Sequence, residues 1–363
     1  MSFSSYILNQ KLREVDQELA LPPRISLIQA TDSSSGWISH YGGLRELANY
    51  SKIFSELPVR FNATWQHGVF AEYRYRRYPE LILYGVNHKP DRLILVATQH
   101  QTSCLNSIGY TNVHAVGLPF IYAKPSNLPK RKQGSVLAMP AHSLDGSPFE
   151  SEQLIDTYAM WLADKYAKQF GSMYACIHMS CIRNGQWWPA FLDKKINVVG
   201  GADHQDANSY SRMWSLFSRF DTVTTNNIGS HLYYALAAGC KVVIEGPDVP
   251  LTKKQLMNDA TYQRMAQKGM TLTGNSEANR EIELVKTTFS KPRRGIELGN
   301  DQIGACNQKS PSEVRSLLEW RKRDQICDAS LSLAKDKLNL ALKFKAKGSI
   351  VSRRFLSKAG SQC

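Results

Sequence analysis

The sequence lacks any long apolar run and any paired-cysteine motif. No stretch of about 18 apolar residues occurs among its 363 residues, so no membrane-spanning helix is expected. The chain does not start with basic residues followed by an apolar segment, so no secretory signal peptide is expected. The seven cysteines are irregularly spaced and form no Cys-x-x-Cys pair, which predicts free thiols in a reducing cytoplasm.

Several ligand-binding motifs are missing as well. No Gly-x-Gly-x-x-Gly follows an early strand and no Gly-x-x-x-x-Gly-Lys-Ser/Thr occurs, which argues against a dehydrogenase and against a P-loop enzyme. No Asp-x-Asp element is present to hold a divalent ion on a nucleotide sugar. His204-Gln205-Asp206 alone offers too few ligands for a metal site. We therefore expect neither a metal nor a cofactor.

Acidic residues are fewer than basic ones. The chain has 31 Asp and Glu against 45 Lys and Arg, a formal net charge of +14, which favours phosphates, nucleotides, polyanionic glycans or an anionic membrane surface as partners. Much of the excess lies in residues 331–363, where eight Lys or Arg accompany one acid. Apolar residues at helical spacing predict a basic amphipathic helix there. It either lies on an anionic membrane surface through residues 331–358 or packs on the core.

Predicted strands and helices alternate in two blocks. After an expected helix over 5–20 and strand over 24–30, the stronger predicted strands are 92–98, 113–119, 135–139, 174–178, 196–199, 222–225 and 241–244. Such alternation predicts an α/β fold with two Rossmann-like doubly wound domains facing a cleft, followed by C-terminal helices. The expected division is an acceptor-side domain (1–122), a Pro- and Lys-rich linker (123–134), a nucleotide-donor domain (135–290), closing helices (291–330) and the basic tail (331–363).

The segment 221–244 carries the strongest pattern. It predicts a strand, a polar turn, a helix that ends at Gly239, and another strand. Gly229 permits a close backbone approach, and Ser230 is expected to cap the helix. Free N–H groups at the start of such a helix, at the carboxyl edge of a sheet, suit a phosphate. An ordinary strand-to-helix turn is the alternative.

Polar residues recur after every predicted strand of the second block, which predicts a binding site along that edge. The expected donor-binding residues are His142, His178, Arg183, Gly200, His204, Thr225, Asn226, Gly229, Ser230 and His231.

The segment 221–244 resembles the late donor-site motif of GT-B glycosyltransferases, in which a polar turn and Gly/Ser precede a helix ending in Ala-x-x-Gly. It is most similar to proteins of bacterial surface-polysaccharide biosynthesis (capsule or lipopolysaccharide) and to the CDP-glycerol glycerophosphotransferase-like family. Thr64-Trp65-Gln66-His67-Gly68 resembles the Trp-His-Gly element of that family, and Leu137–His142 resembles the Ala-Pro-Thr segment that opens its donor domain.

The resemblance implies a metal-independent, inverting transferase in the cytoplasm or on the inner face of the cytoplasmic membrane. Its partners would be a nucleotide-activated donor, of CMP/CDP or UDP type, and a glycan or glycolipid acceptor. It also implies His67 as general base, a role that suits a neutral imidazole because its pKa lies near the working pH. Asp145 and Glu72 are the runner-up carboxylates.

Two alternatives stay open at this point. A polyol-phosphate transferase of CDP-glycerol type would use the same fold. A basic binding protein for polyanions or nucleic acid would show steep salt dependence. Interleaved cations and aromatics at 73–78 can stack on bases or sugars, and contact with the acceptor is the preferred role there. Nucleic acid is not an expected partner, because two doubly wound domains exceed what that task needs.

Overall fold

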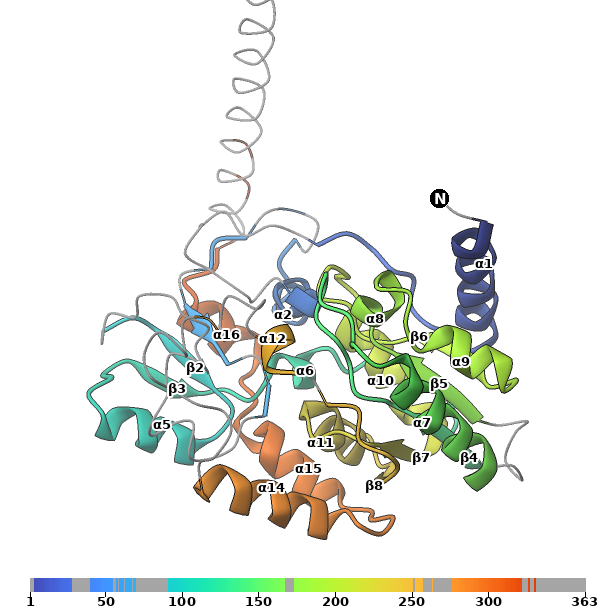
Figure 1. The fold of residues 1–363 in the computed structure, drawn as a ribbon. Coiled ribbons are helices and arrows are strands. Elements are labelled where there is room, and N and C mark those ends of the chain that lie inside the picture. Colours follow the sequence, from blue (N-terminus) through green and yellow to red (C-terminus); the bar gives the residue numbers. More distant parts are fainter. Residues whose placement is uncertain are drawn as a thin grey trace, which may run out of the picture.

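The computed structural model contains two parallel sheets (Figure 1). It describes residues 3–27, 40–54, 57, 59–61, 63–66, 68–69, 91–166, 173–250, 252–256, 263, 276–321, 326 and 330. His67, Glu72, residues 73–78 and the basic tail 331–363 lie outside the described residues, so the roles predicted for them stay predictions. The α/β class with two Rossmann-like sheets is confirmed.

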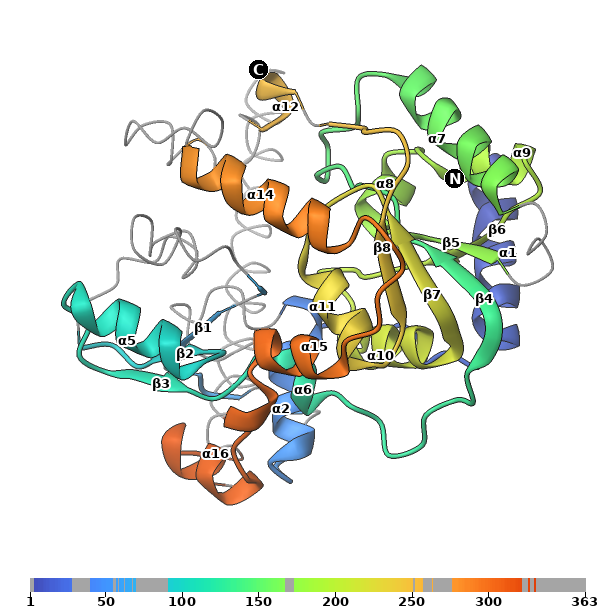
Figure 2. The ribbon, with the colours of Figure 1, turned by 90° about the horizontal axis from the view of Figure 1, so that it is seen from below.

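The first sheet has short strands in its described part. Its order is β1 (Thr64–Trp65), β2 (Ile94–Val96) and β3 (Val113–Ala115), all parallel. Helix α5 (Gln99–Ser107) connects β2 to β3 and begins at a capping box formed by Thr98 and Gln101. α2 (Gly43–Tyr50) and the short α6 (Pro119–Tyr122) lie between this sheet and the second one (Figure 2).

The second sheet is larger and holds five parallel strands in the order β6-β5-β4-β7-β8. Their bounds are β4 (Lys132–Ala138), β5 (Met173–Ile177), β6 (Asn197–Gly200), β7 (Phe220–Thr225) and β8 (Lys241–Ile244). The order reverses next to β4, which is the arrangement of a doubly wound sheet. β4 begins at Lys132, so the last residues of the stretch expected as a linker, 132–134, belong to this strand.

Alternate residues of these strands face opposite helix layers. Leu137 joins the core beneath α10 (Ser209–Arg219) and α11 (Ser230–Ala237), whereas Val136 and Ala138 join the core beneath α7 (Glu152–Lys165) and α9 (Trp188–Asp193). This follows from the period of two in a strand. Because both faces are covered, the strands read as nearly continuous apolar runs, and that is why the sequence predicts them well.

The N-terminal segment packs on the second sheet rather than on the first. α1 (Phe3–Glu18) lies beside β6, and its Leu8 and Leu12 are buried in the core of α7 and α9. The strand expected over 24–30 is wrong in its described part, where a single bridge joins Ser26 to Asp206. Buried Arg212 explains the attachment, because it pairs with Asp16 at 2.8 Å and holds the chain before that bridge.

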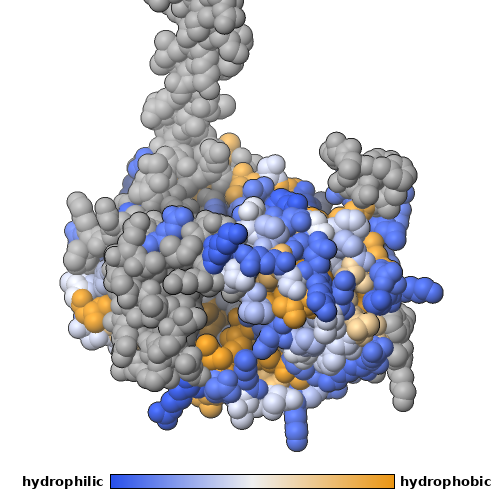
Figure 3. Space-filling model, in the orientation of Figure 1, coloured by the Kyte–Doolittle hydropathy of each residue, from blue (hydrophilic) through white to orange (hydrophobic). Residues whose placement is uncertain are grey.

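The C-terminal helices return from the second sheet to the first. α14 (Ser276–Thr288) precedes α15 (Ile296–Ile303), which packs on α11 at Gly299. A Cβ there would lie 2.4 Å from the Ala237 nitrogen. The short turn η3 (Ala305–Asn307) and α16 (Pro311–Leu317) then reach the first sheet. Short helices α8 (Met179–Arg183) and α12 (Lys253–Leu256) complete the described elements. Hydrophilic side chains dominate the visible face of the second sheet's region (Figure 3).

Candidate functional site

The carboxyl ends of the second sheet's strands bring the predicted residues to one edge. His142 follows β4, His178 follows β5, and Thr225 ends β7. Because the strands are parallel, all three emerge on the side where open α/β sheets bind ligands. The sequence prediction that polar residues recur along one edge is therefore matched by their placement.

Two stacked histidines occupy the centre of this edge. The rings of His142 and His178 are 4.5 Å apart and inclined by 24°. His178 Nδ1 lies 2.7 Å from Ser180 Oγ, and its Nε2 lies 3.3 Å from the Tyr41 hydroxyl. Burial, and then the neighbouring His142, place the pKa of His178 well below its usual range. His178 is therefore a neutral imidazole at physiological pH.

A third histidine stands at the start of α11. His231 Nε2 lies 3.2 Å from the buried Thr225 hydroxyl. Burial, with a smaller effect of His142, lowers the pKa of His231 to about 4. Neutral imidazole can donate or accept a hydrogen bond but carries no charge, so His231 offers a polar contact and not a cation.

The polar turn before α11 differs in one respect from the prediction. Gly229 stands at the N-cap position in an extended conformation, so the N-cap residue has no side chain to cap α11. Ser230 is the first residue of the helix, so its predicted role as cap is wrong. Its hydroxyl instead accepts the Val69 N–H at 2.9 Å.

Asn226 connects the loops that follow three strands. Its side-chain oxygen accepts the Ala141 N–H at 2.8 Å, and its amide donates to the Pro247 carbonyl at 2.8 Å. The residue is buried. Its amide is therefore used in holding the exits of β4, β7 and β8 together.

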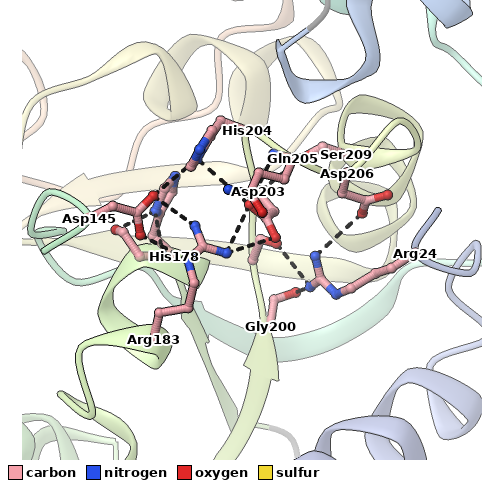
Figure 4. A network of polar contacts seen from close by, with 12 residues as sticks. Arg24, Asp145, His178, Arg183, Gly200, Asp203, His204, Gln205, Asp206 and Ser209 are labelled. Atoms are coloured by element: carbon pink, nitrogen blue, oxygen red, sulfur yellow. Dashed lines mark hydrogen bonds and ion pairs between the residues drawn. The ribbon is translucent and has the colours of Figure 1, made fainter. Parts of the chain in front are cut away.

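Arg183 is held between two carboxylates (Figure 4). Its Nε and Nη2 donate to the two oxygens of Asp145 at 2.8 and 3.0 Å, and its Nη1 donates to both oxygens of Asp203. His204 Nδ1 lies 3.3 Å from Asp145. Both Asp145 oxygens are therefore already used in hydrogen bonds with the Arg183 guanidinium. Arg183 in turn brings no uncompensated charge to the edge.

The Gly200 carbonyl accepts a hydrogen bond from the N-terminal segment of the chain. Arg24 Nη2 donates to the Gly200 carbonyl at 2.6 Å and to the Gly201 carbonyl at 3.1 Å, and Nη1 reaches Asp206 at 3.4 Å (Figure 4). A Cβ at Gly200 would lie 2.6 Å from that guanidinium. The end of β6 is thus used to attach the N-terminal segment at Arg24.

The residues around His67 meet the second sheet's edge. Gly68 and Val69 contact Ser230, because a Cβ at Gly68 would lie 2.4 Å from its Oγ. Buried Gln66 anchors the same segment by donating to the Gly68 carbonyl at 2.7 Å. The segment predicted to carry the base and the turn predicted to bind the donor are therefore neighbours.

Tyr41 is a site residue that sequence reasoning missed. It has a left-handed φ of 58° and is followed by Gly42 at 80°, where a Cβ would lie 1.9 Å from the Ala207 carbonyl oxygen. A non-glycine residue in this region costs of order 1–3 kcal/mol and often marks a functional position. Burial first, then Asp203 and Asp145, raise the pKa of Tyr41 to about 12, so it is a neutral hydroxyl. In the sequence, the signal that could have pointed to Tyr41 is an aromatic residue directly before Gly42-Gly43.

Two features are absent from the described part of the chain. No group of three or more His, Cys, Asp or Glu there could hold a metal ion. No helix in that part is long and apolar enough to cross a bilayer. The five described cysteines (Cys104, Cys176, Cys181, Cys240 and Cys306) are free thiols, as predicted.

No protein-family model and no curated protein matches the sequence. Solved structures show a distant similarity at low sequence identity. UDP-GlcNAc 2-epimerase from Neisseria meningitidis, bound to UDP-GlcNAc, is 14% identical over 76% of this chain and 70% of its own, with a TM-score of 0.35. UDP-GlcNAc 2-epimerase from Methanocaldococcus jannaschii is 11% identical over 82% of this chain and 80% of its own, with a TM-score of 0.33.

The S. aureus protein TarM, in complex with UDP, is 14% identical over 69% of this chain, with a TM-score of 0.31. This chain spans about half of TarM, 48% of its length. Similarity at this level leaves the function to be argued from the chain's own residues.

Proposed function

We propose that the protein is a metal-independent GT-B glycosyltransferase that moves a sugar from a nucleotide-activated donor to a surface glycan or glycolipid. The observation that supports this most is the contact of Gly68 and Val69 with Ser230. It sets the chain next to His67 against the first turn of α11. A base on that segment would stand beside a donor bound along the second sheet's edge.

The donor's phosphates would lie at the start of α11. The N-cap residue of this helix, Gly229, has no side chain to cap it, and the Thr225 and His231 side chains stand at the same turn. The leaving nucleotide gains negative charge as the bond to the sugar breaks, and oriented N–H and O–H donors stabilise that charge without a metal. Arg183 is neutralised by Asp145 and Asp203, so in this proposal it shapes the edge and does not bind phosphate.

The acceptor hydroxyl would lose its proton to His67. Asp145 is less suited because its oxygens are paired with Arg183. Glu72 remains the carboxylate alternative in this proposal. Direct attack of the acceptor with a single base would invert the configuration at the sugar carbon.

A nucleotide screen tests the proposal. We expect one of CMP, CDP, UDP and GDP to raise the thermal midpoint, because a ligand that binds the native state stabilises it. A CDP preference would favour the polyol-phosphate donor over a sugar. His67→Ala should abolish transfer and keep nucleotide binding, with His114→Ala, an exposed residue of β3, as the matched control.

Either of two results would count against the proposal. Binding that is indifferent to all four nucleotides and falls steeply with salt would favour a polyanion-binding protein instead. Full turnover by His67→Ala would remove that residue from the mechanism.

A further inference from the structure

The Ser230 hydroxyl has a defined partner that is not a ligand. The Val69 N–H, from the segment after β1, donates to Ser230 Oγ at 2.9 Å. We propose that Ser230 is a positioning residue, which anchors Gly68 and Val69 to the first turn of α11, and that it does not bind the donor. This inference rests on the proposed function, because it gives that segment a place in catalysis.

The opposite side of the segment is fixed by Gln66. This side chain is fully buried, and its oxygen accepts the Ala97 N–H from the end of β2 at 3.0 Å. Its amide donates to the Gly68 carbonyl at 2.7 Å, and the Gln66 N–H continues the ladder to Leu95. The segment is thus held from the first sheet by Gln66 and from the second sheet's edge by Ser230. Removing one of these two contacts should let the segment shift without unfolding either sheet.

Gly68 makes this contact close enough to be tested sterically. A Cβ at Gly68 would lie 2.4 Å from Ser230 Oγ, which is far inside van der Waals contact. The next atom it would meet is Ser230 Cβ at 3.5 Å, which is an ordinary contact. Among the described residues, an alanine at Gly68 therefore collides with the Ser230 hydroxyl alone. Deleting that hydroxyl makes room for the added methyl group.

The experiment compares Ser230→Ala, Ser230→Thr, Gly68→Ala and the double variant Gly68→Ala/Ser230→Ala. Affinity is measured calorimetrically for CMP, CDP, UDP and GDP. Turnover is measured as release of the bound nucleotide from its sugar conjugate with water as acceptor. Ser215→Ala is the matched control, since its hydroxyl bonds only the Ser211 carbonyl within α10 among the contacts described for it. Thermal midpoints identify any variant that fails to fold.

We expect Ser230→Ala to lower turnover roughly 10- to 100-fold, as a displacement of about 1 Å can, while nucleotide affinity stays unchanged. Ser230→Thr keeps the hydroxyl and should retain activity. Gly68→Ala alone should lower turnover, but the double variant should be no worse than Ser230→Ala, because the two changes act on one contact. If Gly68→Ala does not fold, recovery of folding in the double variant supports the same contact.

Different failures have different meanings. A tenfold loss of nucleotide affinity in Ser230→Ala would make Ser230 a donor ligand and overturn the inference, while the proposed function would stand. Additive losses in the double variant would overturn the shared contact in the same way. Absence of nucleotide binding by the wild type would overturn the proposed function and the inference together.

Discussion

The carboxyl edges of the two sheets are used differently. At the first sheet, the returning C-terminal segment covers the strand ends: Asn307 donates to the Ala97 carbonyl at 3.0 Å, and Leu118 N–H donates to the Ile303 carbonyl at 2.9 Å. At the second sheet, the corresponding positions carry histidines and hydroxyls that contact one another. The exits of β2 and β3 are thus bonded to the chain's own C-terminal segment, whereas the exits of the second sheet present polar side chains, as the proposed donor site requires.

The two sheets nevertheless share one core, and the largest expected effect comes from breaking it. Phe120 of α6 is fully buried and stacked between Trp214, at 4.5 Å, and Tyr234, at 4.1 Å. We expect Phe120→Ala to lower the free energy of unfolding by about 3–5 kcal/mol, as measured by denaturant titration. Phe54→Ala, at an exposed position, should cost about 0.5 kcal/mol or less. Similar losses in both variants would mean that the sheets are joined elsewhere.

A smaller effect should come from disturbing the covered edge alone. Gly304 has φ 69°, and a Cβ there would lie 1.9 Å from the Ala97 carbonyl oxygen. Gly146 has the same φ, and no described residue would lie within 4 Å of a Cβ there. We expect Gly146→Ala to cost about 1 kcal/mol from its backbone conformation alone, and Gly304→Ala about 3 kcal/mol because the collision adds to it. Equal thermal shifts in the two variants would show that the C-terminal segment does not press on the first sheet's edge.

The smallest effect concerns two histidines with a lowered pKa: His231 at the start of α11, and His40, whose ring lies 5.3 Å from that of His204. The pKa of His231 and that of His40 are both lowered to about 4 from 6.5, chiefly by burial. Below pH 6.5 the unfolded chain then binds more protons than the folded one. The free energy of unfolding is therefore retained above pH 6.5 and falls as the pH drops below it. Between pH 6.5 and 5.5 we expect a loss of about 1 kcal/mol per histidine.

Chemical denaturation across this pH range measures that loss. His231→Gln should remove the contribution of one histidine from the dependence of the unfolding free energy on pH. His114→Gln, at an exposed position of β3, should leave that dependence unchanged. A slope unaffected by His231→Gln would mean that this imidazole is not buried in its neutral form.

The strands of the second sheet were predictable because burial on both faces makes them continuous apolar runs. The expected strands 174–178, 222–225 and 241–244 match β5, β7 and β8 closely. The helix after the polar turn was equally visible, since Gly239 ends it and takes a left-handed φ of 88°. The gathering of the histidines at one edge was predictable from a single rule, that the strands of a parallel sheet all end on the same side.

The pairings within the site were not predictable. Arg183 was expected to bind the donor, yet it lies between Asp145 and Asp203, and Gly200 accepts Arg24 from a segment 176 positions away. Tyr41 was missed because its left-handed backbone arises from contact with residues 204–207, which local sequence does not encode.

The sequence by itself determined the layers, the edge on which polar residues gather, and the absence of the common nucleotide motifs, because these depend on periodicity and on short local patterns. The tertiary structure alone decided which polar groups are paired with one another and which first-sheet segment reaches α11. Those choices depend on contacts between residues that are distant in the sequence, such as Asp145 and Arg183, 38 positions apart, and Val69 and Ser230, 161 apart, whose geometry only the packed core fixes.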